Sequence, residues 1–342
     1  LSINLTCYKS EVIKTWCCKM LEILGITSSF FAVIALGALT KYIGLFDEKS
    51  SQIFSIFAFY IALPPLIIVS IMSNPVKGLL NFDYIVRFEI ATLIIFLLSY
   101  LVAKFIFKLK GSEDTIFALN STYSNYGYIG VPLVILLFGG EAILPASLIL
   151  VFDIAIVLSL VAIFSTNFNN SSSFLNLIKA FKSILKNPVI ISCVVGLLLS
   201  YHEISLGKIP EETLNILSGA AVPTALFAIG IIIVSKRVEK AYSELFFISL
   251  IKLIIHPLLV IFLFLFWSTD KVKMLEIMWI QVAIIFSCLP VAATVFPVAQ
   301  YYKSYVSKTS SAIIVTTILS IITIPAVLFL TNIENITKIT LP

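Results

Sequence analysis

Residues 120–132 read NSTYSNYGYIGVP, a polar stretch inside an otherwise apolar part of the chain. It holds two Asn, three Ser or Thr and three Tyr, and it carries no charge. Amide and hydroxyl groups within a membrane helix need hydrogen-bond partners. Gly127 and Gly130 permit an unwound backbone and a close approach of another chain segment. Pro132 lacks a backbone donor and interrupts a helical ladder. The stretch therefore predicts a broken helix with polar groups gathered at the break.

The composition of the whole chain indicates an integral membrane protein. Of its 342 residues, 60% are hydrophobic and 12% are charged, whereas globular domains carry about 25% charged residues. The net charge of +5 is spread along the chain, so the dense basic face that binds nucleic acid is missing. We expect the lipid bilayer as a partner and no nucleic acid.

Ten apolar runs are suited to crossing a bilayer, which takes about 20 residues of helix. They lie at 23–40, 53–72, 84–107, 115–139, 142–164, 187–201, 214–235, 245–267, 277–302 and 310–330. Of the 23 Lys and Arg residues, 13 lie in loops after odd-numbered spans and six in loops after even-numbered spans. The positive-inside rule then predicts a multi-pass protein with both termini outside the cytoplasm.

The longest polar interruption, 165–186, divides these spans five and five. An odd number of spans per half gives the halves opposite orientations, as in inverted repeats. Prolines occupy matching spans: Pro64, Pro65 and Pro223 in the second and seventh, and Pro132, Pro290 and Pro297 in the fourth and ninth. Matched interrupted spans point to a transporter's binding site, although simple proline kinks would leave the same pattern.

We expect five regions along the chain. They are an N-terminal extension at 1–20, a first five-helix repeat at 21–164, a cytoplasmic linker at 165–186, a second inverted repeat at 187–331 and a short tail at 332–342. The extension holds three lysines although it would face outward, so translation starting near Met20 is one alternative. A signal peptide cleaved near Gly37 is another, but cleavage would remove a span that the repeat requires.

Three motifs resemble the auxin efflux carrier family, the bacterial and archaeal relatives of plant PIN transporters, within the bile acid/arsenite/riboflavin transporter superfamily. Asn125 to Pro132 matches an Asn-x4-Gly-x-Pro pattern, Asn187-Pro188 matches the opening of a sixth helix, and the third match runs from Leu289-Pro290 to Tyr301. The resemblance covers about residues 21–330. It implies an all-α membrane protein of ten transmembrane helices, in which the broken helices four and nine cross at mid-membrane.

The resemblance also implies a scaffold of helices one, two, six and seven, often dimeric, and a transport domain that moves like an elevator. Known relatives carry carboxylates. The implied substrate-binding residues are Asn125, Tyr126, Gly127, Gly130, Pro132, Pro290 and Thr294. Thr294 stands where the family often has Asn, and Gln300 where a Glu is common, so the identity of the substrate stays open.

Ionisable residues inside spans are candidates for function by default. We take Asp153, Lys252 and His256 as candidates for a proton or cation relay. The alternatives are a structural, hydrogen-bonded acid for Asp153, a snorkelling side chain for Lys252 and a packed donor for His256. Glu89 and Glu276 are expected near span ends, at the membrane interface.

The sequence thus predicts a secondary active or facilitative transporter of a small organic anion across the cytoplasmic membrane, working as a homodimer by family analogy. A sodium-coupled carrier of the bile-acid type and a transporter-like membrane sensor are the rival hypotheses. An enzyme would need a cluster of acid, base or metal-ligating groups, and two His residues are too few. No GxxxxGK[ST] motif for ATP occurs, and neither a cofactor nor a metal is predicted.

Overall fold

The computed structural model describes residues 11–73, 81–164, 187–235, 238–265 and 277–330. Within these ranges the protein is all-helical and contains no strand, only an isolated antiparallel bridge between Ser124 and Val291. The predicted linker 165–186 and tail 332–342 lie outside the described residues.

The helices follow one another through the described ranges with several short π or 3-10 turns, labelled η, between them. In order they are α1 Glu11–Tyr42, α2 Glu48–Ile56, η1 Phe57–Ala62, α3 Leu63–Ser73, α4 Phe82–Leu101, η2 Val102–Ile106, α5 Ser112–Thr122, η3 Tyr126–Gly130, α6 Val131–Phe138, η4 Gly140–Ala142, α7 Ile143–Phe164, α9 Pro188–Tyr201, α10 Lys208–Ser235, α11 Tyr242–Leu250, η5 Ile251–Ile255, α12 His256–Leu265, α13 Ile277–Ser287, α14 Val295–Tyr301 and α15 Val306–Leu330.

Six helical segments are long and apolar enough to cross a membrane. They are Glu48–Ser73, Phe82–Ile106, Gly140–Val161, Lys208–Ser235, Tyr242–Leu265 and Val306–Leu330. Four shorter apolar helices, Ser28–Tyr42, Tyr126–Phe138, Pro188–Tyr201 and Ile277–Ser287, coincide with the remaining predicted spans. The chain is therefore an all-helical, multi-pass membrane protein.

Local sequence explains where several helices begin. The Asp47 carboxylate accepts hydrogen bonds from the hydroxyl and the backbone N–H of Ser50, forming a capping box at the start of α2. These bonds also hold the pKa of Asp47 below its usual value. The Asn187 side chain accepts from the Val189 N–H, and Pro188 fills the first turn of α9, where a missing donor costs nothing.

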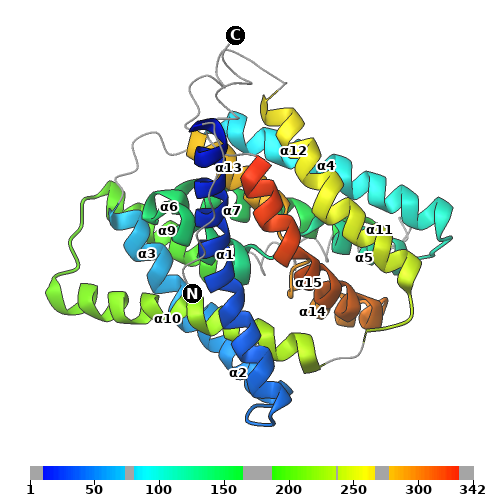
Figure 1. Ribbon diagram of the computed structural model, residues 1–342, viewed down its shortest axis with the longest axis horizontal. Helices are drawn as coiled ribbons and strands as arrows, with labels where there is room; N and C mark the ends of the chain where they lie inside the picture. The colour runs from blue at the N-terminus through cyan, green and yellow to red at the C-terminus, as the bar shows by residue number, and fades with distance from the viewer. Residues whose placement is uncertain (1–10, 74–80, 165–186, 236–237, 266–276, 331–342) are drawn as a thin grey trace.

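The described helices pack in two groups. One contains α1, α2, α3, α9 and α10, and the other contains α4, α5, α7, α11, α12 and α13, while α15 contacts both groups. Figure 1 shows α3 and α9 on one side of α1, α10 crossing α1, and α4, α11 and α12 on the other side. The division separates the helices that the resemblance assigns to a scaffold from most of those that it assigns to a transport domain.

The prolines of the first group do not interrupt their helices, contrary to the prediction. Pro223 lies inside the continuous helix α10, and Pro64 and Pro65 lie within α3. The π turn η1 immediately precedes the two adjacent prolines. A widened turn of this kind accommodates a missing backbone donor without ending the helix.

Candidate functional site

The predicted spans 115–139 and 277–302 leave helical geometry in their interior, after Thr122 and after Ser287 respectively. The Asn125 N–H donates to the Pro290 carbonyl at 3.0 Å, and the Ala292 N–H donates to the Tyr123 carbonyl at 3.1 Å. We call residues 123–125 and 290–292 the backbone junction. These hydrogen bonds pair groups that a broken helix would leave unsatisfied in an apolar surrounding.

A new half-helix begins directly after the first break. The Asn125 side-chain oxygen accepts from the Tyr128 N–H at 3.4 Å and so caps the π turn η3. Pro132 lies in the first turn of α6, where its missing donor is harmless. A Cβ on Gly130 would lie 2.7 Å from Leu289 Cδ1, so glycine allows the half-helix to approach the end of α13 closely.

Lys252 binds both breaks from the neighbouring turn η5. Its ammonium donates to Ser124 Oγ at 2.6 Å and to the Ser287 carbonyl at 2.9 Å. The side chain is fully buried, so it does not snorkel to the membrane surface. A buried positive charge is costly unless it is well hydrogen-bonded. Lys252 therefore links the two breaks and adds a positive charge beside them.

His256 completes the coordination of the ammonium. Its Nδ1 lies 3.1 Å from Lys252 Nζ. Because an ammonium has donors only, Nδ1 must be the acceptor, which assigns the ring proton of the neutral imidazole to Nε2. Nε2 is buried without a hydrogen-bond partner within the described structure. His256 thus acts as an acceptor for Lys252.

Two cavities adjoin the backbone junction. The larger, about 420 Å³, lies between α2 and α10 on one side and Tyr128, α14 and α15 on the other. Its lining includes the acid Glu48 and the polar side chains of Ser51, Gln52, Ser55, Thr294, Gln300 and Ser310, and it contains no Lys or Arg. The smaller, about 40 Å³, is lined by residues 123–128, Ala292 and Thr294 among others. Tyr128 and Thr294 line both cavities.

The structure brings only some of the predicted substrate-binding residues to a cavity. Asn125, Tyr126, Gly127 and Thr294 line the smaller cavity. Gly130, Pro132 and Pro290 are buried and do not appear in the lining of either cavity. Pro290 contributes its carbonyl to the backbone junction, so these three residues shape the site without lining it.

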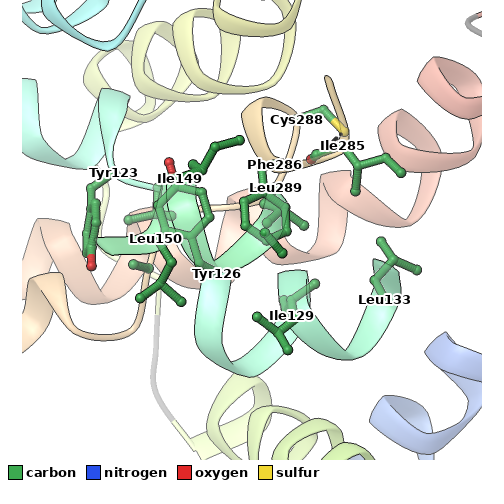
Figure 2. Close-up of a cluster of buried hydrophobic side chains, with 14 of the residues drawn as sticks. Tyr123, Tyr126, Ile129, Leu133, Ile149, Leu150, Ile285, Phe286, Cys288 and Leu289 are labelled. Atoms are coloured by element: carbon green, nitrogen blue, oxygen red, sulfur yellow. Dashed lines mark hydrogen bonds between the residues drawn. The ribbon is translucent and has the colours of Figure 1, made fainter. Parts of the chain in front are cut away.

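Tyr126 anchors the half-helix in the apolar core. Its ring centroid lies 4.9 Å from that of Phe286 and 5.7 Å from that of Tyr123. Figure 2 shows the Tyr126 and Phe286 rings side by side, with Ile129 and Leu133 following along the half-helix. The ring is 2% exposed, and its hydroxyl has no hydrogen-bond partner in the described part of the chain.

Asp153 and Glu89 are buried acids on the adjacent helices α7 and α4. Asp153 is 1% exposed, and its Oδ1 accepts from Thr92 Oγ1 at 2.8 Å. Asp153 and Lys252 form no direct ion pair in the described structure. Glu89 is 5% exposed, so its expected place at the membrane interface was wrong. Glu276 lies outside the described residues.

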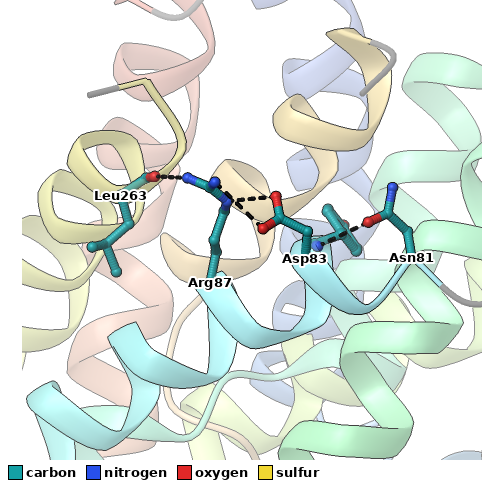
Figure 3. A network of polar contacts seen from close by, with 5 residues as sticks. Asn81, Asp83, Arg87 and Leu263 are labelled. Carbon is teal, nitrogen blue, oxygen red and sulfur yellow. Dashed lines mark hydrogen bonds and ion pairs between the residues drawn. The ribbon is translucent and has the colours of Figure 1, made fainter. Parts of the chain in front are cut away.

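Arg87 shows that the position of a residue along a membrane span does not determine whether its side chain is exposed. The Arg87 guanidinium is also buried, and it bonds Asp83 at 2.8 Å and the Leu263 carbonyl at 2.8 Å. Figure 3 shows Arg87 reaching between Asp83 and the end of α12. These partners compensate the charge of Arg87, whereas both oxygens of Glu89 lack hydrogen-bond partners in the described ranges.

Sequence reasoning missed Ser124, Ser287 and Thr92 as individual site residues. Ser124 was visible only as one hydroxyl among several in residues 120–132. Ser287 acts through its carbonyl, for which the identity of the side chain gives no signal. Thr92 is one polar residue in α4. Its hydrogen-bond partner, Asp153, comes 61 positions later in the chain. Contacts of this kind depend on the fold.

Comparison with known proteins identifies the class. The membrane transport protein family model (Mem_trans) matches residues 18–328. The chain therefore belongs to this family, the auxin efflux carrier (AEC/PIN-like) family. It is a membrane transporter rather than an enzyme.

Two curated relatives match over most of their length. A protein of Rhizobium meliloti (strain 1021), named "Putative malonate transporter", is 27% identical over 313 residues, which cover 91% of this chain and 96% of the relative. An uncharacterized transporter of Methanocaldococcus jannaschii is 26% identical over 307 residues, which cover 85% of this chain and 93% of the relative.

Proposed function

We propose that the protein carries a small organic anion with a carboxylate group across the cytoplasmic membrane. The carboxylate binds where two broken membrane helices cross, between the cavity residues Asn125, Tyr128 and Thr294. The helices are the fourth, formed by α5, η3 and α6, and the ninth, formed by α13 and α14. The backbone hydrogen bonds between residues 123–125 and 290–292 support this crossing.

The proposal rests on the buried position of Lys252 beside both helix breaks. The lining of the larger cavity offers hydroxyl and amide groups and one acid, Glu48, but no Lys or Arg, so an anion there needs a positive charge from elsewhere. The Lys252 ammonium contacts Ser124, which lines the smaller cavity. A fixed charge in a water-excluded surrounding acts over a longer range than one in solvent. Lys252 therefore favours an anion at the crossing without needing to touch it.

The packing supports an elevator movement. The larger cavity lies between α2 and α10 of one group and α14 and α15 near the crossing. If the two broken helices moved together along the group that contains α1, α2, α3, α9 and α10, the anion site would open to alternate sides of the membrane. The ten apolar segments support two inverted repeats of five, and the loop charges support extracytoplasmic termini.

The substrate class follows from the site and from one relative. Hydroxyl groups, an amide and a nearby ammonium suit a carboxylate. The name of the Rhizobium meliloti relative adds malonate as a first compound to test. We therefore take malonate as the probe and shorter and longer carboxylates as its comparison series.

Uptake of labelled malonate into proteoliposomes tests the role of Asn125. We expect Asn125→Ala to lower the initial uptake rate about tenfold, because a hydrogen bond to a charged group contributes about 1.5–3 kcal/mol. Asn125→Asp keeps an acceptor for the Tyr128 N–H but adds a negative charge, so it should fail as well. Asn215→Ala, on the exposed face of α10, is the matched control. Equal uptake by all four proteins would refute the assigned role.

A further inference from the structure

We infer that Glu89 and Asp153 form a carboxyl pair that takes up one proton from water when the anion binds. The inference rests on the proposed function, because it names the ion that is coupled to the anion at the same crossing. It gives a role to Glu89, a buried acid that neither ion pairing nor hydrogen bonding explains within the described structure.

The two acids come from helices that pack together. Glu89 and Thr92 lie three residues apart on α4, and α4 packs against α7, which carries Asp153. Thr92 donates to Asp153 Oδ1, and the Tyr126 hydroxyl lies near the same carboxylate. Both oxygens of Glu89 lack a hydrogen-bond partner within the described residues. Residues three apart lie on the same face of a helix, so Glu89 shares with Thr92 the face of α4 that meets Asp153. Glu89, whose two oxygens have no partner there, thus shares one buried region with Asp153.

Such an arrangement requires a proton. Two ionised carboxylates buried close together repel each other, and each loses its hydration. One proton on Glu89 removes the second charge. The empty protein then holds one carboxylate, Asp153, against one ammonium, Lys252, whose charges also interact. The buried site is neutral in this state.

Anion binding disturbs that neutrality. A bound carboxylate adds one negative charge near Tyr126, which lines the smaller cavity. The Tyr126 ring lies close enough to both acids for electrostatic interaction. Uptake of a proton by Asp153 restores neutrality, so the affinity for the proton and the affinity for the anion rise together. The pair thereby couples one proton to each anion bound.

The other ionisable groups around the pair leave this balance unchanged. Tyr123 and Tyr126 face Asp153 from the first break, and Lys252 faces it from η5. His256, on α12, faces Lys252 through Nδ1 and accepts from the ammonium. Tyrosine hydroxyls are neutral in the physiological range, and His256 is already committed as an acceptor. Lys252 keeps its proton because its ammonium contacts three acceptors, Ser124 Oγ, the Ser287 carbonyl and His256 Nδ1. The carboxyl pair is therefore the group that exchanges the proton.

A first experiment is independent of the substrate. Infrared spectra of the purified protein in lipid at neutral pH should contain the C=O absorption of a protonated carboxyl group. We expect Glu89→Gln to lose this band, since Asp153 then remains ionised opposite Lys252. Glu141→Gln, which changes an exposed acid on η4, should keep it. A wild-type spectrum without the band, or a band that survives in Glu89→Gln, would overturn the inference.

A second experiment measures the coupling. Addition of malonate to weakly buffered protein with a pH indicator should take up about one proton for each anion bound. The double variant Glu89→Gln/Asp153→Asn should bind malonate without this uptake. Malonate binding without proton uptake by the wild type, or malonate transport driven by a sodium gradient at constant pH, would overturn the pair and leave the anion site standing. Absence of malonate binding would instead count against the proposed substrate, while the infrared experiment still decides the protonation of the pair.

Discussion

Replacement of Lys252 by Met is expected to abolish measurable malonate uptake. The ammonium holds Ser124 and the Ser287 carbonyl together and supplies the positive charge beside the cavities. In an effective dielectric constant of about 20, two unit charges about 8 Å apart attract by ~2 kcal/mol, which corresponds to about 30-fold in affinity. Loss of the link between the two breaks adds to this effect, so we expect the uptake rate to fall at least a hundredfold.

Two controls separate charge from structure in this experiment. Lys208→Met removes an exposed lysine at the start of α10 and should transport normally. A thermal-shift series with malonate and its uncharged diester should show that Lys252→Met loses the stabilisation by the anion. Retention of anion-dependent stabilisation by Lys252→Met would contradict the electrostatic role. A variant that no longer unfolds cooperatively would assign Lys252 to the fold instead.

Replacement of Gly230 by Ala is expected to cause a large loss of stability. Gly230 lies where α10 crosses α1, and an added Cβ would lie 2.0 Å from the Ile34 carbonyl oxygen and 2.9 Å from Gly37 Cα. These are backbone atoms, so the helices themselves must separate. Small residues at helix crossings in membranes permit such close packing, and overpacking costs about 1–3 kcal/mol or more. We expect a decrease of several degrees in the unfolding temperature in detergent.

Gly219→Ala provides the matched control on the same helix. A Cβ there would meet nothing within 4 Å, while both substitutions gain the same helix propensity, about 1 kcal/mol. The difference between the two variants therefore isolates the contact with α1. Equal unfolding temperatures for both variants would show that α1 and α10 do not pack as closely as described.

The sequence predicted a break within residues 120–132 because they combine amides, glycines and a proline inside an apolar run. The structure places it after Thr122, whereas Gly127 and Gly130, where unwinding was expected, lie in the π turn η3. Those local properties determine where a membrane helix can end. Sequence reasoning failed at Pro223, because whether a proline ends a helix or is accommodated within it depends on the surrounding packing. Local sequence patterns therefore predicted where helices occur, but not whether a helix continues through a proline.

The site itself could be predicted only in part. Asn125 and Thr294 were identified from the motifs and line the smaller cavity. The role of Lys252 depended on whether its side chain reached the surface or turned inward, and sequence position allows both. Glu89 was misplaced for the same reason, because a residue near the start of a span can face lipid headgroups or a neighbouring helix. Only the positions of α7 and α12 beside α4 decide this.

An experimental structure in lipid with bound malonate tests the central claim most directly. We predict that the ligand lies at the backbone junction, with a carboxylate within hydrogen-bonding distance of Asn125 or Thr294, and that Lys252 contacts both breaks at the middle of the bilayer. Malonate bound elsewhere, or the segments 123–125 and 290–292 lying apart from each other, would contradict the account.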